Sequence, residues 1–148
     1  MRAIQTFEVS LKAFIVRGDT ALFVREADSG YWELPGGRID AGEEWAEHAQ
    51  VLARELREEL GPGFAATFGA ESVTWTRQRP TDGVFQFIVA RIGQAGAGEP
   101  LLSAEHDAMG WFGLAAARGL GFPERSGYAG GIEALWRLIK GPRLMGAT

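Results

Sequence analysis

The residues with the clearest chemical potential are three glutamates, Glu55, Glu58 and Glu59. On an α-helix these positions are related by i, i+3 and i+4, so the carboxylates project from one side and repel one another. A divalent cation relieves that repulsion, and hard oxygen ligands suit Mg²⁺ or Mn²⁺, which bridge to substrate phosphates. The spacing therefore predicts a metal site. The alternative is a solvated charged face, on which Arg54 and Arg57 pair with the glutamates.

A glycine-rich loop precedes this helix and favours the metal interpretation. It comprises residues 34–37, Leu-Pro-Gly-Gly, and continues into the acidic stretch Asp-Ala-Gly-Glu at residues 40–43. A glycine lets the backbone approach a metal ion or a phosphate closely and leaves its carbonyl oxygen available as a ligand.

With the loop included, the segment from Gly37 to Pro62 resembles the Nudix box, G-x5-E-x7-R-E-U-x-E-E-x-G-U, where U is an aliphatic residue. Gly37 and Glu43 match the opening of the box at the family's spacing. The close of the box is matched by Arg54, Glu55, Leu56, Glu58, Glu59 and Gly61. The preceding residues 31–36 also resemble the strand that leads into the box. The chain is therefore identified as a member of the Nudix hydrolase family.

Two features depart from the family's pattern. Ten residues lie between Glu43 and Arg54, where the pattern has seven, so the insertion either lengthens the helix N-terminally or enlarges the loop. In the family, the first glutamate of the box pairs with the arginine, and here Glu43, Glu44 or Glu47 is a candidate for that role. Pro62 replaces an aliphatic residue but follows the glycine that ends the helix, so we expect little consequence.

The resemblance implies a Mg²⁺-dependent pyrophosphohydrolase that cleaves a phosphoanhydride of a nucleoside diphosphate linked to X, such as a nucleoside triphosphate or a nucleotide sugar. A metal-activated water attacks one phosphorus, and Mn²⁺ can substitute for Mg²⁺. The implied metal ligands are Glu55, Glu58, Glu59 and the Gly37 carbonyl, and Arg54 is expected to orient Glu55. The alternative is a weakly active or inactive Nudix-like module that binds a nucleotide or has a regulatory role.

The general base is left open among a box glutamate, Glu105 and His106. In the family, such a residue often lies on a loop far along the chain, and these two precede a predicted strand. Glu105 resembles an additional metal-binding glutamate and is slightly favoured. His106 resembles the base histidine of the GDP-mannose-hydrolysing branch, and histidine titrates near neutrality. A solvated polar loop is the alternative for both residues.

Four further residues are candidates for substrate binding. Trp75, Arg77 and Arg79 alternate along one predicted strand and share a face, on which an aromatic ring could stack a base and arginines could hold phosphates. A core tryptophan with solvent-facing arginines is the alternative. For Arg57, a phosphate contact and a plain solvated charge are equally supported by the sequence.

Hydrophobic periodicity predicts the elements that position these residues. Strands are expected at residues 7–16, 20–25, 31–34, 68–79, 84–92 and 109–112, helices at 44–60 and 131–140, and a surface loop at 93–100. This order predicts a mixed β-sheet covered by helices, of the α+β or α/β class, and the resemblance implies an α/β/α sandwich. A single domain over residues 1–148 is expected from the length.

The composition narrows the classes of partner. A formal net charge of −4 argues against an extended nucleic-acid surface but allows one bound nucleotide, since a metal ion supplies positive charge locally. The absence of cysteine excludes disulfides and thiolate sites. No apolar run is long enough for a signal peptide or a membrane span, so a cytoplasmic protein is expected. A homodimer is kept as an option, because many relatives dimerise through strands outside the box.

Overall fold

The computed structural model describes residues 1–141, and residues 142–148 of the predicted domain lie outside the described part. The strands are β1 (Glu8–Arg17), β2 (Thr20–Glu26), β3 (Trp32–Glu33), β4 (Gly36–Arg38), β5 (Ala66–Gln78), β6 (Phe85–Ala95) and β7 (His106–Phe112). The helices are α1 (His48–Leu60), α2 (Leu114–Arg118), the 3-10 turn η1 (Glu124–Ser126) and α3 (Tyr128–Lys140).

The strands form one mixed sheet in the order β3-β2-β1-β6-β5, with β4 added to β1 and β7 added to β2. The pair β1–β6 is parallel, and the other pairs are antiparallel. Strand β1 lies in the middle of the sheet, and its central residues are buried on both sides and apolar except for Lys12. The predicted mixed sheet with covering helices is confirmed.

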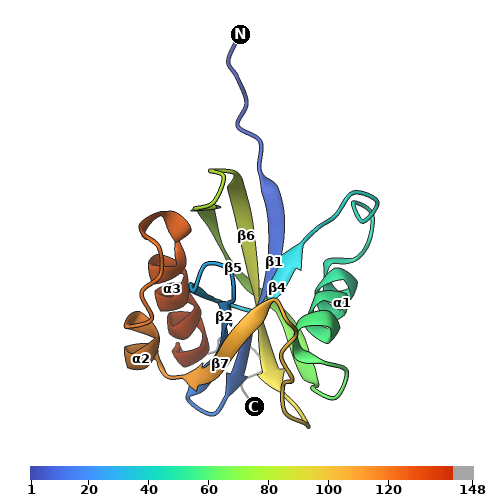
Figure 1. The fold of residues 1–148 in the computed structure, drawn as a ribbon, viewed down its shortest axis with the longest axis vertical. Coiled ribbons are helices and arrows are strands. Elements are labelled where there is room, and N and C mark those ends of the chain that lie inside the picture. Colours follow the sequence, from blue (N-terminus) through green and yellow to red (C-terminus); the bar gives the residue numbers. More distant parts are fainter. Residues whose placement is uncertain (142–148) are drawn as a thin grey trace.

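Helices cover both faces of this sheet, with α1 on one side and α2 and α3 on the other (Figure 1). The alternation of side chains along β1 divides the apolar core between the two faces. Leu11 and Ile15 pack in the cluster that contains Leu52 of α1, whereas Phe14 packs in the cluster that contains Trp136 of α3. No helix within residues 1–141 is long and apolar enough to cross a membrane.

The insertion in the box enlarges the loop before α1. The helix begins at His48, not at residue 44 as predicted, and residues 40–47 form turns instead. The amide of Glu43 donates to the Asp40 carbonyl at 3.0 Å, and the amide of Ala46 donates to the Glu43 carbonyl at 3.0 Å. These turn hydrogen bonds absorb the extra residues before the helix starts, so the carboxylate face of α1 keeps its direction.

The observed bounds of β6, α3 and β7 also differ from the predicted ones, and glycines lie at two of these bounds. Strand β6 continues to Ala95 through the predicted loop at 93–100, because Gly93 lets the Phe68 ring of β5 pack on its Cα. Helix α3 starts at Tyr128 rather than at residue 131, after Gly127 with φ +70°. Strand β7 starts at His106 rather than at residue 109, and the short elements β4, α2 and η1 were not predicted.

Candidate functional site

An acidic pocket of about 750 Å³ lies where the glycine loop, the C-terminal half of α1 and the start of β7 meet. Its lining includes most of the candidate residues predicted from the sequence: Gly37, Arg54, Glu55, Glu58, Glu59, Arg77, Arg79, Glu105 and His106. It also includes residues that were not predicted, among them Ser10, Lys12, Glu26, Asp28, Glu33, Arg38 and Gln86. The pocket therefore joins segments that lie far apart in the chain.

Gly36 fixes the position of the third box glutamate. It pairs with Lys12 in the β1–β4 register, at φ +137°, and a Cβ there would collide with the Leu11 carbonyl oxygen. Only glycine accommodates both constraints. The Gly36 amide donates a hydrogen bond of 2.8 Å to Glu59 Oε2, which holds this buried carboxylate against the loop.

Gly37 accommodates Glu55 in a similar way. A Cβ at Gly37 would overlap the carboxyl group of Glu55, so the absence of a side chain lets that carboxylate lie directly on the loop. The Glu55 side chain is 13% exposed, whereas that of Glu58 is 59% exposed. Glu55 and Glu59 therefore lie inside the pocket, and Glu58 lies at its rim.

Arg54 ties the enlarged loop to the helix through Glu43. The Arg54 Nη2 donates to Glu43 Oε1 at 2.8 Å, and its Nε donates to Glu43 Oε2 at 3.1 Å, a two-point ion pair. The same guanidinium lies 3.2 Å from Glu55 and 3.3 Å from Glu58. Of the three candidate partners left open by the sequence, Glu43 makes this contact.

A buried charge network supports the pocket from the sheet. Lys12 Nζ donates to Glu33 Oε1 at 2.6 Å, and their side chains are only 5% and 10% exposed. Burial works against both charges, but their mutual attraction outweighs it, so the pKa of Lys12 is raised and that of Glu33 is lowered. His106 Nε2 lies 3.9 Å from the second carboxylate oxygen of Glu33.

Burial also changes the acidity of the box glutamates. It raises the pKa of Glu59 to about 7, although Lys12 and the hydrogen bond from Gly36 oppose the rise. Burial likewise raises the pKa of Glu55, while the adjacent Arg54 opposes that shift. A carboxylate whose charge is penalised in this way gains from a nearby cation.

The donor atoms present fit a divalent cation. Glu59, Glu105 and His106 each offer one ligand atom, and these atoms lie within 4.8 Å of one another. His106 Nδ1 is buried without a hydrogen-bond partner among the described residues. A cation held by these groups would supply the counter-charge that the buried Glu59 carboxylate lacks.

The substrate-binding candidates separate into three environments. Arg77 Nη1 donates to Gln86 Oε1 at 2.9 Å inside the pocket, whereas Arg79 is held by Asp82 and Glu8. Trp75 lies in the core, edge-on to the Tyr128 ring at 5.2 Å, and Arg57 is exposed. Neither Trp75 nor Arg57 lines the acidic pocket.

Among the site residues that the sequence analysis missed, Lys12 and Glu33 form the buried ion pair. Lys12 interrupts a run of buried apolar residues in β1, and this lone charge in an apolar strand is the signal that could have indicated it. Glu33 lies in a two-residue strand and carries no such signal. Their pairing depends on the sheet register, which local periodicity does not specify.

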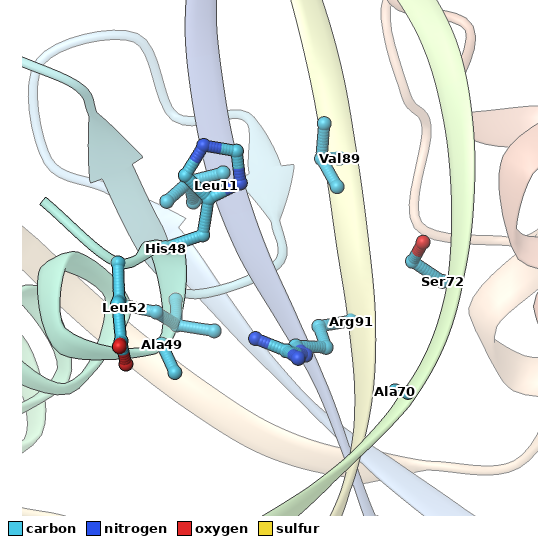
Figure 2. A pocket seen from close by; sticks show the side chains of 9 residues that line it. Leu11, His48, Ala49, Leu52, Ala70, Ser72, Val89 and Arg91 are labelled. Atoms are coloured by element: carbon cyan, nitrogen blue, oxygen red, sulfur yellow. The ribbon is translucent and has the colours of Figure 1, made fainter. Parts of the chain in front are cut away.

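A second pocket of about 380 Å³ lies on the opposite face of the sheet, between α1 and the strands β5 and β6. Figure 2 shows Leu11, Leu52 and Val89 around it, with Arg91 extending from the sheet toward the helix and His48 at the start of α1. Glu47 is the sole carboxylate among its lining residues. This pocket, named here the α1–β6 pocket, offers no cluster of metal ligands.

The chain is similar to known proteins in sequence and in fold. The chain is 47% identical to "Putative 8-oxo-dGTP diphosphatase 2" of Mycobacterium tuberculosis over 58 residues, 36% of this chain and 39% of that protein's length. The crystal structure of UDP-X diphosphatase superposes with a TM-score of 0.73 at 21% identity, covering 96% of this chain and 67% of the other. The Escherichia coli ORF135 protein superposes with a TM-score of 0.67 at 27% identity, covering 97% and 96%.

A family model extends the match to most of the chain. The model described as NUDIX domain matches residues 6–132, which include the glycine loop, α1 and the start of β7 that form the acidic pocket. The chain belongs to the NUDIX domain family.

Proposed function

We propose that this chain is a Mg²⁺-dependent pyrophosphohydrolase that cleaves the phosphoanhydride of a nucleoside diphosphate linked to a second group, with Mn²⁺ able to replace Mg²⁺. The observation that carries the proposal is the acidic pocket, in which Glu55 and Glu59 lie against the glycine loop and Glu59 lies near Glu105. The names of similar proteins, which act on nucleotides, support the substrate class.

In this proposal the cation is held by Glu59 and Glu105, with Glu58 and the Gly37 carbonyl as further oxygen ligands, and Glu55, which the sequence also predicted as a ligand, has a different role. When bound, it offsets the negative charge of the diphosphate and lowers the pKa of a bound water. We assign the proton-accepting role to the Glu55 carboxylate, because burial makes it more basic than an exposed glutamate. Water oxygen bonds to one phosphorus, the bridging P–O bond breaks, and two phosphate products leave.

The arginine side chains of the pocket have separate roles in the proposal. Arg54 orients Glu55 and holds the loop through Glu43. Arg77 is the preferred phosphate contact, since its guanidinium faces the pocket beside Gln86, whereas Arg79 is already neutralised by two carboxylates.

A substrate panel tests the proposal. Purified protein is incubated with nucleoside triphosphates, nucleotide sugars, ADP-ribose and dinucleoside polyphosphates, each with Mg²⁺, with Mn²⁺ or with EDTA, and the products are resolved by chromatography. Glu58→Gln is compared with Glu71→Gln, an exposed glutamate outside the acidic pocket. We expect metal-dependent cleavage of at least one compound, reduced about 10²-fold or more in Glu58→Gln and unchanged in Glu71→Gln.

Other outcomes have defined meanings. Metal-induced stabilisation without turnover of any compound would replace the hydrolase by a nucleotide-binding or regulatory NUDIX domain. The absence of both turnover and any metal effect would overturn the assignment of the acidic pocket as a metal site.

A further inference from the structure

His106 is a buried imidazole with an unsatisfied ring nitrogen. The residue is 7% exposed at the start of β7, and its Nδ1 makes no hydrogen bond within the described part of the chain. Buried polar atoms are nearly always paired, so this unpaired nitrogen is unusual. One ring nitrogen of His106 lies within 4.8 Å of ligand oxygens of Glu59 and Glu105.

Glu33 lies near the Nε2 nitrogen of His106. Its Oε1 is held by Lys12 at 2.6 Å, and its Oε2 lies 3.9 Å from His106 Nε2. The negative charge of Glu33 favours the tautomer with the proton on Nε2, which leaves a lone pair on Nδ1. A carboxylate behind the ring in this way orients metal-binding histidines and makes them more basic.

We propose that His106 is a nitrogen ligand of the divalent cation in the acidic pocket, and that it completes a donor set with Glu59 and Glu105. Ligand atoms bound to one ion at about 2.1 Å are at most about 4.2 Å apart. The three candidate atoms lie within 4.8 Å of one another, so a small side-chain movement closes the set. This inference rests on the proposed function, because it requires a cation in that pocket.

A nitrogen ligand changes which cation the pocket prefers. Mg²⁺ selects oxygen ligands, whereas imidazole suits transition metals. The set of two carboxylates and one imidazole therefore favours Mn²⁺ over Mg²⁺ more strongly than a set made only of oxygens.

The test uses the fact that the chain has two histidines, His48 and His106. His48 lies in the α1–β6 pocket and provides the matched control. The full chain is labelled with ¹⁵N only in histidine, loaded with Mn²⁺, and measured by electron spin echo envelope modulation. We expect ¹⁵N coupling to Mn²⁺ in the wild type and in His48→Gln, and none in His106→Gln. The Mn²⁺ affinity of His106→Gln, from titration of the free-ion signal, should fall about tenfold or more, with a smaller change for Mg²⁺.

The outcomes separate this inference from the proposed function. Mn²⁺ binding without histidine coupling in the wild type overturns the role of His106 and leaves the metal site intact. The absence of Mn²⁺ binding in the wild type overturns the inference together with the metal site on which it rests. The wild type and His48→Gln decide the assignment by themselves, even where circular dichroism shows that His106→Gln is unfolded.

Discussion

Two consecutive residues of β1 contribute to two very different pockets. Lys12 faces the acidic pocket, and Leu11 faces the α1–β6 pocket on the other side of the sheet. In the acidic pocket, the lysine is buried and its charge is matched by Glu33 at 2.6 Å. In the α1–β6 pocket, Leu11 lies beside other apolar side chains, and the charged groups Glu47 and Arg91 are at least partly exposed.

Among the residues that the structure describes, only one side of the sheet near β1 holds buried charges that could support catalysis. Charges removed from water interact strongly, but each must be matched by another charge or by a ligand. The acidic pocket meets this requirement with the network around Lys12 and still leaves Glu59 and the Nδ1 of His106 undercompensated. In the α1–β6 pocket, Glu47 is exposed and Arg91 donates to a backbone carbonyl, so its lining within residues 1–141 holds no undercompensated buried carboxylate.

Among the variants considered, Lys12→Met is expected to have the largest effect on stability. The substitution leaves Glu33 buried without its partner, and we expect the free energy of unfolding to fall by about 3–5 kcal/mol. Denaturant unfolding with the two-state tests measures the change.

The matched control is the double variant Lys12→Met/Glu33→Leu, which removes both charges. Replacing a buried ion pair with apolar residues is often close to neutral, so most of the lost stability should return. A double variant that is no more stable than the single variant would show that the two charges are not coupled.

The next effect is stabilisation by metal. Mg²⁺ at about 100 times its dissociation constant should stabilise the folded chain by about 2.7 kcal/mol. For a chain of this size the melting temperature should rise by about 5–10 °C and return to its starting value with EDTA. Glu59→Gln should abolish the rise and Arg91→Met should keep it, as measured by calorimetry. A rise that survives in Glu59→Gln would place the cation elsewhere.

The parts of the site that lie close together in the sequence could be predicted from it. The box glutamates lie on one helix and the glycine loop adjoins it, so spacing alone brought Glu55, Glu58 and Glu59 to one face. Residues 105 and 106 were found only through their position relative to the family's pattern. Helix α1 and most strands were predicted because their apolar periodicity is local.

The rest required tertiary information. Lys12 lies opposite Gly36 because of the register between β1 and β4. Glu33 lies close to Lys12 because β3 pairs with β2. Trp75 shares a strand face with Arg77, yet α3 covers the first and leaves the second in the pocket. Periodicity predicts which residues share a face of a strand. It does not predict that a helix covers only part of that face.

A smaller effect is expected from the loop anchor. Glu43→Gln removes the two-point ion pair with Arg54, so the loop that carries Gly37 is less firmly held. We expect kcat/KM to fall about tenfold, as for other residues that orient a metal site. Glu44→Gln is the control, because Glu44 forms no ion pair within residues 1–141 and should leave kcat/KM unchanged. Equal losses of kcat/KM in both variants would show that the negative charge of the loop matters and the Glu43–Arg54 ion pair does not.

The smallest effect is expected in the α1–β6 pocket. Arg91 Nε donates to the Gly69 carbonyl at 2.9 Å in the irregular part of the β5–β6 pairing, and its side chain extends into that pocket. Arg91→Met keeps the apolar part of the side chain and loses this hydrogen bond, so the free energy of unfolding should fall by about 0.5–1.5 kcal/mol. Hydrolysis and the metal-induced rise in melting temperature should not change, because Arg91 is separated from the acidic pocket by the sheet. A loss of hydrolysis at unchanged stability would show that substrate contacts both faces of β1, and the division between the two pockets would then be wrong.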